Sequence, residues 1–106
     1  MTRPREELKA QTRALRPHPR ADLVPPLSEG EYQALRDDIK ARGIQVPLVV
    51  RGEASLVILC GHQRLRAALE LSLGEVPVTV ASLNGTSEEE YIILDNLRRR
   101  QLSSYH

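Results

Sequence analysis

One segment of the chain carries residue types that suit the binding of an anion. An apolar run, Ser55 to Leu59, leads through Cys60 into Gly61, and a cationic stretch with Arg64 and Arg66 then begins a predicted helix. A helix that starts at such a point directs backbone N–H groups and arginine side chains to one place, which suits a phosphate. Ordinary exposed cations on a helix surface are the alternative interpretation of the two arginines.

A second group of polar side chains lies near the other end of the chain. Asp95 and Arg99 are four residues apart on a predicted helix, which also ends in the basic run 98–100. The simplest interpretation is a surface ion pair worth about 0.3–0.5 kcal/mol, with the arginines complementing the helix dipole. A contact with nucleic acid is the functional alternative for Arg98, Arg99 and Arg100.

Composition narrows the classes of function. The chain has no Phe, no Trp and only three Tyr among 106 residues, so binding of RNA by base stacking on an aromatic sheet is set aside. The net charge is +1, but the first twenty residues and the run 98–100 are basic while acidic residues gather between them. This asymmetry permits contact with nucleic acid at the ends of the chain.

The single cysteine and the hydropathy pattern indicate a cytoplasmic protein. Cys60 has no partner for a disulfide within the chain, no apolar stretch is long enough to span a membrane, and the N-terminus lacks a signal core. At the end of an apolar run, Cys60 is expected to be a small buried hydrophobe, with a redox role as the alternative.

Apolar spacing and capping residues predict the order helix, strand, strand, helix, strand, helix. Ser28 and Glu31 form a capping box for the first helix, and Thr86 or Ser87 caps the last. The expected helices are 29–42, 62–72 and 87–100, and the expected strands are 46–51, 56–60 and 76–80. The fold class is α/β (α+β), a small mixed sheet with packed helices.

The ends of the chain are expected to lie outside this domain. Residues 1–14 are basic and are predicted to form a flexible arm, with an extended element at residues 13–15. The domain itself is predicted to cover residues 15–102. Leu102 and Ser103 resemble the start of another helix, so residues 103–106 are predicted to begin a following helix in a longer protein.

Four blocks of sequence resemble the N-terminal domain of the ParB family, which shares a superfamily with sulfiredoxin. The blocks occur in the family's order and spacing and together cover roughly residues 15–105. They are Gly43–Val50, Cys60–Ala68, Glu75–Val78 and Asp95–Arg99.

The resemblance implies a nucleotide site. In the family the glycine-led box binds a nucleoside triphosphate, CTP in ParB, and the last block helps to hold Mg²⁺ and the phosphates. Carried over by position, the phosphate-binding residues are Gly61, His62, Gln63, Arg64, Arg66 and Arg99. The metal ligands are Asp95 and Asn96, whose oxygens suit Mg²⁺ bound jointly with phosphates.

This chain departs from the family pattern at several of these positions. His62 and Gln63 stand where the family usually has glutamate and arginine, so one cation is lost or depends on pH. Asp95 replaces a glutamate, and Val46 stands where many members have a glutamine. The departure at Val46 leaves the choice of CTP over other nucleotides open.

The sequence therefore predicts a nucleotide-binding switch or clamp domain of a DNA-associated protein with a partition, plasmid, phage or regulatory role. It would be at most a slow NTPase. A homodimer and binding to DNA, here or through an adjoining domain, are compatible with this interpretation. One alternative is a module that binds the DNA backbone without nucleotide chemistry, and another is a nuclease or ATP-using enzyme of the sulfiredoxin superfamily.

Overall fold

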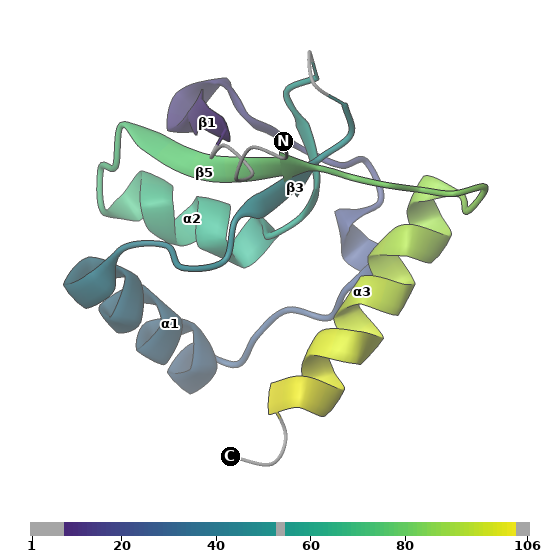
Figure 1. Ribbon diagram of the computed structural model, residues 1–106. Helices are drawn as coiled ribbons and strands as arrows, with labels where there is room; N and C mark the ends of the chain where they lie inside the picture. The colour runs from purple at the N-terminus through teal and green to yellow at the C-terminus, as the bar shows by residue number, and fades with distance from the viewer. Residues whose placement is uncertain (1–7, 53–54, 104–106) are drawn as a thin grey trace, which may run out of the picture.

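A curled sheet of five short strands organises the molecule (Figure 1). The computed structural model describes residues 8–52 and 55–103. In chain order the strands are β1 (Leu8–Gln11), β2 (Arg16–Pro17), β3 (Leu48–Val50), β4 (Val57–Cys60) and β5 (Glu75–Val80). The helices are α1 (Glu29–Arg42), α2 (His62–Glu70) and α3 (Glu88–Ser103), with short 3₁₀ turns η1 (Thr12–Ala14) and η2 (Ala21–Leu23).

The sheet is mixed, as the sequence predicted. Its strand order is β1-β5-β3-β4-β2, and β1 pairs antiparallel with β5 while β5 runs parallel to β3. β3 and β4 are antiparallel, with an irregular register between Val49 and Val50, and β2 runs parallel to β4. Helix α2 lies in the crossover from β4 to β5, which places its first residues at the end of β4.

Successive residues of the central strands pack on opposite faces of the sheet. Leu48 and Val50 of β3 join the core cluster that includes Leu65 of α2, whereas Val49 between them joins the cluster that contains Ile92 of α3. This alternation is the period of two that a β-strand imposes. The two clusters therefore place α2 and α3 against opposite faces of the sheet.

Helix α1 packs on α2 and begins and ends where its sequence predicts. Ser28 Oγ accepts from the Glu31 backbone N–H at 3.1 Å, and the Glu31 carboxylate accepts from the Ser28 N–H at 2.9 Å. This reciprocal pair satisfies two donors that the helix alone leaves unbonded. Tyr32 and Ile39 then bury one face of α1 against Ala67 of α2.

Among the described residues, the structure differs from the predicted arm at the N-terminus. Residues 8–11 form the edge strand β1, and Thr12 is 1% exposed and donates its backbone N–H to the Gly74 carbonyl. The extended element predicted near residues 13–15 starts later than expected, because Arg13 lies in the 3₁₀ turn η1 and the extended backbone begins at Leu15 and leads into β2. The sequence of β1 carries only a weak alternation, so its strand conformation comes from pairing with β5.

The prediction for the last residues is wrong at Ser103. Helix α3 continues through this residue, so it does not begin a following helix. Residues 104–106 lie outside the described part of the chain. Helix α2 and strands β3, β4 and β5 lie where they were expected, with β3 three and α2 two residues shorter than predicted. Strand β2 was not among the expected elements.

Candidate functional site

Gly61 is held in a backbone conformation that only glycine adopts readily. Its φ is +100°, in the left-handed region, and it directly precedes α2. A methyl group added here would lie 2.8 Å from Leu48 Cγ and 3.3 Å from a guanidinium nitrogen of Arg64. Gly61 thus lets the chain turn tightly from β4 into α2 over a buried leucine, with Arg64 folded back beside it.

The first turn of α2 combines donors and positive charge. An α-helix leaves its first N–H groups without partners in the helix, and Gly61 at the N-cap has no side chain to satisfy them. The first turn contains no acidic residue, and the Arg64 side chain folds back to the same point. This arrangement favours an anion because the backbone dipoles and the guanidinium carry the same sign.

His62 is a neutral member of this segment, fixed by a hydrogen bond from outside it. The His18 backbone N–H donates to His62 Nε2 at 3.1 Å, which a ring protonated at Nε2 could not accept. Burial, and then the nearby His18, lower the pKa of His62 below its ordinary value. The ring proton of neutral His62 therefore lies on Nδ1, where it can be donated to an acceptor.

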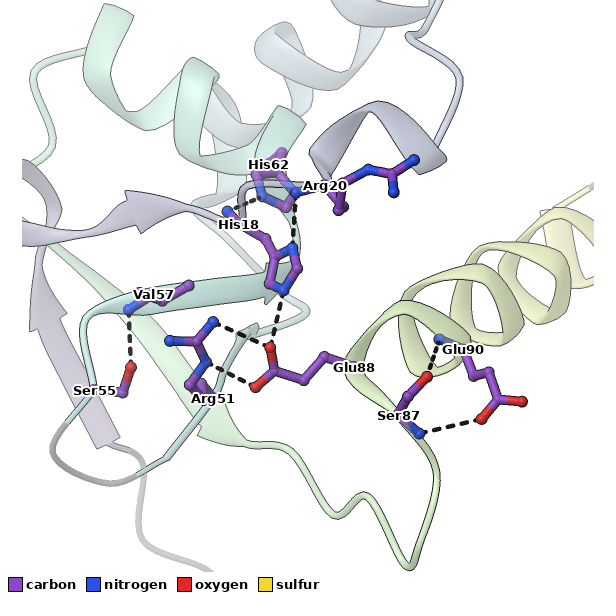
Figure 2. A network of polar contacts seen from close by, with 9 residues as sticks. All are labelled: His18, Arg20, Arg51, Ser55, Val57, His62, Ser87, Glu88 and Glu90. Atoms are coloured by element: carbon purple, nitrogen blue, oxygen red, sulfur yellow. Dashed lines mark hydrogen bonds and ion pairs between the residues drawn. The ribbon is translucent and has the colours of Figure 1, made fainter.

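A network of long-range contacts adjoins this segment (Figure 2). The His18 ring is buried and accepts the Arg20 backbone N–H at Nδ1, 2.9 Å away, so its proton lies on Nε2. Nε2 donates to Glu88 Oε1 at 2.9 Å, and Arg51 makes a two-pronged contact with the same carboxylate at 2.7 and 3.1 Å. Hydrogen bonds from Arg51, then from His18, hold the pKa of Glu88 below its usual range.

The sequence did not reveal this network. Its histidines are 44 positions apart, and His18 and Glu88 are 70 apart, so no local spacing connects them. The proximity of His18 to two prolines could only have marked it as a turn residue. The contact network joins the segment just before η2, the start of α2, the residue after β3 and the start of α3.

Arg66, predicted to face phosphate, lies in other contacts. Its guanidinium stacks 3.7 Å above the centre of the Tyr32 ring, and Nε lies 3.5 Å from Glu70. Tyr32 donates its hydroxyl to the same carboxylate at 2.7 Å, and Arg36 lies 3.3 Å from it. The structure therefore places Arg66 between α1 and α2, away from the side chain that folds over Gly61.

The predicted metal ligands lie on α3. Asp95 is 7% exposed and follows Ile92 by one turn, and Ile92 packs against Cys60, the residue before Gly61. An open pocket of about 410 Å³ lies beside Asp95, lined by Tyr91, Leu94, Arg98 and the loop between β5 and α3. Asp95 thus lies on the same face of α3 as Ile92, which packs against Cys60. The residues that line the pocket beside Asp95 do not include the segment 61–66.

The cationic end of α3 is only partly described. Arg98 has a 69% exposed side chain and donates to Asp95 Oδ1 at 3.2 Å. The helical backbone continues through Arg99 and Arg100, whose side chains lie outside the described part of the structure. The carboxylate of Asp95 therefore pairs with Arg98. The ion pair predicted between Asp95 and Arg99 and the predicted contact of Arg99 with phosphate stay predictions.

The oxygen donors of Asp95 and Asn96 suit Mg²⁺ only where a bound ligand supplies further oxygens to the ion. Within residues 8–52 and 55–103, no cluster of three or more His, Cys, Asp or Glu side chains is arranged to hold a metal ion. One buried carboxylate and the neighbouring Asn96 amide are the kind of partial set that Mg²⁺ uses when substrate phosphates and water complete its octahedron. The residues are thus compatible with the predicted ion if phosphates are bound beside it.

Cys60 is packed as its sequence context predicts. It is 5% exposed and belongs to the apolar cluster with Val49, Leu59 and Ile92. A thiol in such surroundings behaves as a small hydrophobe.

In the described part of the chain, no helix has the length and apolar character needed to cross a membrane.

Known proteins of one family resemble the chain. The sequence model of the family described as the ParB N-terminal domain matches residues 3–97 of this chain. The chromosome-partitioning protein Spo0J of Thermus thermophilus is 34% identical over 91 residues, which cover 85% of this chain and 34% of that protein. A probable plasmid-partitioning ParB of the same organism is 40% identical over 75 residues, 69% of this chain and 25% of the relative. The chain thus spans about a quarter to a third of these relatives.

Solved structures agree with the sequence relatives. The truncated chromosome-partitioning protein ParB of Caulobacter crescentus, complexed with CTP-γ-S, superposes with a TM-score of 0.73 at 26% identity, over 89% of this chain and 54% of that one. A Pnob8-like ParB-N domain gives 0.71 at 21% identity, covering 92% and 39%, and supports the fold alone. With its mixed sheet, its glycine-led turn into α2 and the match over residues 3–97, the chain belongs to the ParB N-terminal domain family.

Proposed function

We propose that this domain binds a nucleoside triphosphate, with CTP favoured, at the start of α2. The observation that carries the proposal is the turn at Gly61, where a left-handed glycine, uncapped helix donors and the Arg64 guanidinium meet. Phosphate oxygens are the acceptors that such a group of donors suits. The likeness to a ParB crystallised with CTP-γ-S supports the choice of ligand.

Each of the predicted residues would have a distinct role in nucleotide binding. Gly61 gives the phosphates access to the backbone, Arg64 supplies charge, and His62 and Gln63 donate hydrogen bonds through neutral side chains. Asp95 and Asn96 would hold Mg²⁺, which would neutralise phosphate charge when bound with the nucleotide. Arg99 would reach the phosphates from α3, and Arg66 would join only by leaving its stack on Tyr32.

Binding would act as a switch rather than as fast catalysis. The two groups of ligands lie on α2 and α3, which contact opposite faces of the sheet, so a nucleotide that touched both would fix their relative placement. Loss of a cation at Gln63 reduces the charge available to a phosphoryl-transfer transition state. Hydrolysis, if present, would therefore be slow.

Calorimetric titration of CTP, ATP and GTP with Mg²⁺ tests the proposal. We expect CTP to bind and to raise the melting temperature, and Arg64→Ala to abolish that shift because the cation beside Gly61 is lost. Arg66→Ala is the matched control on the same helix and should weaken binding far less. The proposal fails if the unmutated domain responds to none of the three nucleotides, or if Arg66→Ala and Arg64→Ala lose binding equally.

We further propose that the protein works in partition or another DNA-associated process, as its relatives' names indicate. Arg98, with its exposed side chain, and the following two arginines are the proposed DNA contacts. Each phosphate contact that such a side chain makes steepens the dependence of affinity on salt. Replacing the three arginines with glutamine should therefore flatten the salt dependence of DNA binding, and an unchanged slope would exclude this surface.

A further inference from the structure

His18 occupies a position from which it can connect the phosphate-binding segment with α3. Its backbone N–H donates to His62 at the start of α2, and its ring donates to Glu88, the first residue of α3. The side chain of His18 is 4% exposed, so these bonds form away from competing water. One residue thus contacts both elements that carry the proposed ligands.

The orientation of the His18 ring is determined by two contacts of its own and by a third contact that holds its partner Glu88. The Arg20 N–H donates to Nδ1, which leaves the proton on Nε2 and directs it to Glu88. The carboxylate of Glu88 is in turn held by both nitrogens of the Arg51 fork, the geometry in which arginine fixes a carboxylate most firmly. Figure 2 shows this chain of contacts from His62 through His18 to Arg51.

We infer that His18 is a positioning residue that holds His62 and Glu88 in one hydrogen-bonded unit, so that the phosphate-binding segment and the start of α3 respond together. The unit keeps His62 in the tautomer with its proton on Nδ1, as a neutral donor to the ligand. This inference extends the proposed nucleotide function, because the role of His62 toward phosphate rests on that proposal.

The connection itself can be tested without nucleotide. A double-variant cycle of His62→Ala and Glu88→Ala, measured by urea unfolding, should show coupling of about fivefold or more in the unfolding constant. In a His18→Ala background this coupling should fall to about twofold or less, so that the effects of the two substitutions are nearly independent. The reason is that the alanine keeps the backbone N–H but lacks the ring that contacts Glu88. Arg20→Ala is the control background, since its exposed side chain pairs with Asp22 and its N–H to His18 remains. Coupling that is absent at the outset, or that survives His18→Ala, overturns the inference.

A spectroscopic readout separates positioning from general stability. Ring ¹⁵N spectra at neutral pH should show His62 protonated at Nδ1 and His18 at Nε2. The opposite tautomer at either ring contradicts the network. Glu88→Gln, which keeps an acceptor oxygen, should leave the Nε2 signal of His18 close to its position in the unmutated domain. Glu88→Ala should shift that signal, while the Arg20 N–H still keeps the ring proton on Nε2.

Titration with CTP and Mg²⁺ then tests the consequence for binding. His18→Ala should weaken binding about tenfold while the far-ultraviolet spectrum stays native, and Arg20→Ala should stay within about twofold of the unmutated domain. Equal affinity in His18→Ala and the unmutated domain overturns the role of His18 at the ligand site. A domain that binds no nucleotide refutes the proposed function instead, and the cycle above still decides whether the hydrogen-bonded unit exists.

Discussion

At Gly61 two separate demands fall on one residue. The backbone has a φ of +100°, and a side chain would collide with Leu48, which is completely buried. The first demand costs an ordinary residue about 1 kcal/mol or more in strain, and the second requires the core to shift. A glycine here is therefore needed by the turn itself, in addition to any contact with a ligand.

Gly61→Ala should lower the free energy of unfolding by about 2–4 kcal/mol, from strain and overpacking together. Gly85→Ala is the matched control, because Gly85 also has a positive φ, of +84°, but has open space around it. It should cost only the strain, about 1 kcal/mol. Urea unfolding of both variants measures the difference, and equal losses would refute the close contact with Leu48.

The network around His62 predicts how stability changes with pH. The pKa of His62 is depressed in the folded state below its ordinary 6.5, and that of Glu88 below its ordinary 4.5. In both cases the unfolded chain binds the proton more tightly, so stability falls on acidification. The loss should begin near pH 6.5 for His62 and near pH 4.5 for Glu88.

His62→Gln should flatten the fall in unfolding free energy between pH 7 and 5 and leave the fall below pH 4.5 in place. Glu88→Gln should do the reverse, since the amide does not titrate. Urea unfolding across the pH series provides the measurement. A His62→Gln profile that parallels the profile of the unmutated domain between pH 7 and 5 would show that the surroundings do not lower the pKa of the His62 ring.

At the scale of elements, α3 is attached to the sheet at two places. Its start is held by the contacts of Glu88 and by a capping box between Ser87 and Glu90. One turn later Ile92, 1% exposed, inserts into the cluster around Cys60. Asp95 is the next residue on that face, so the packing of Ile92 determines where the proposed metal ligand lies.

Ile92→Val should therefore affect both stability and binding. Deleting one buried methylene group costs about 0.5–1.5 kcal/mol, whereas Ile93→Val, at a neighbour with 40% exposure, should cost less than about 0.5 kcal/mol. We expect CTP affinity to fall in the first variant and not in the second. Unfolding and titration of the pair give the measurement, and indistinguishable variants would argue against anchoring of α3 by Ile92.

At the scale of the whole molecule, local signals predicted most elements and long-range contacts determined the rest. Helix α1 was predictable because the capping box at its start lies within four residues. The turn at Gly61 was predictable because strand, glycine and helix are consecutive. The network of His18 was not, because its partners are 44 and 70 positions away. Arg66 was assigned to phosphate by position, but its neighbours Tyr32 and Glu70 come from packing of α1 on α2.

The clearest test at this scale concerns β1, which the sequence assigned to an arm. Two chains, one starting at residue 8 and one at residue 15, differ only by β1 and η1. The shorter chain loses four pairings to β5 and uncovers Val76 and Val78, 1% and 8% exposed in the whole domain. We expect it to be about 2–4 kcal/mol less stable in urea, from exposure of apolar surface and loss of backbone hydrogen bonds. Because Gln11 lies at the end of this pairing, a chain starting at residue 12 should already show most of the loss, and equal stability of the chains starting at 8 and 15 would mean that the domain begins at residue 15.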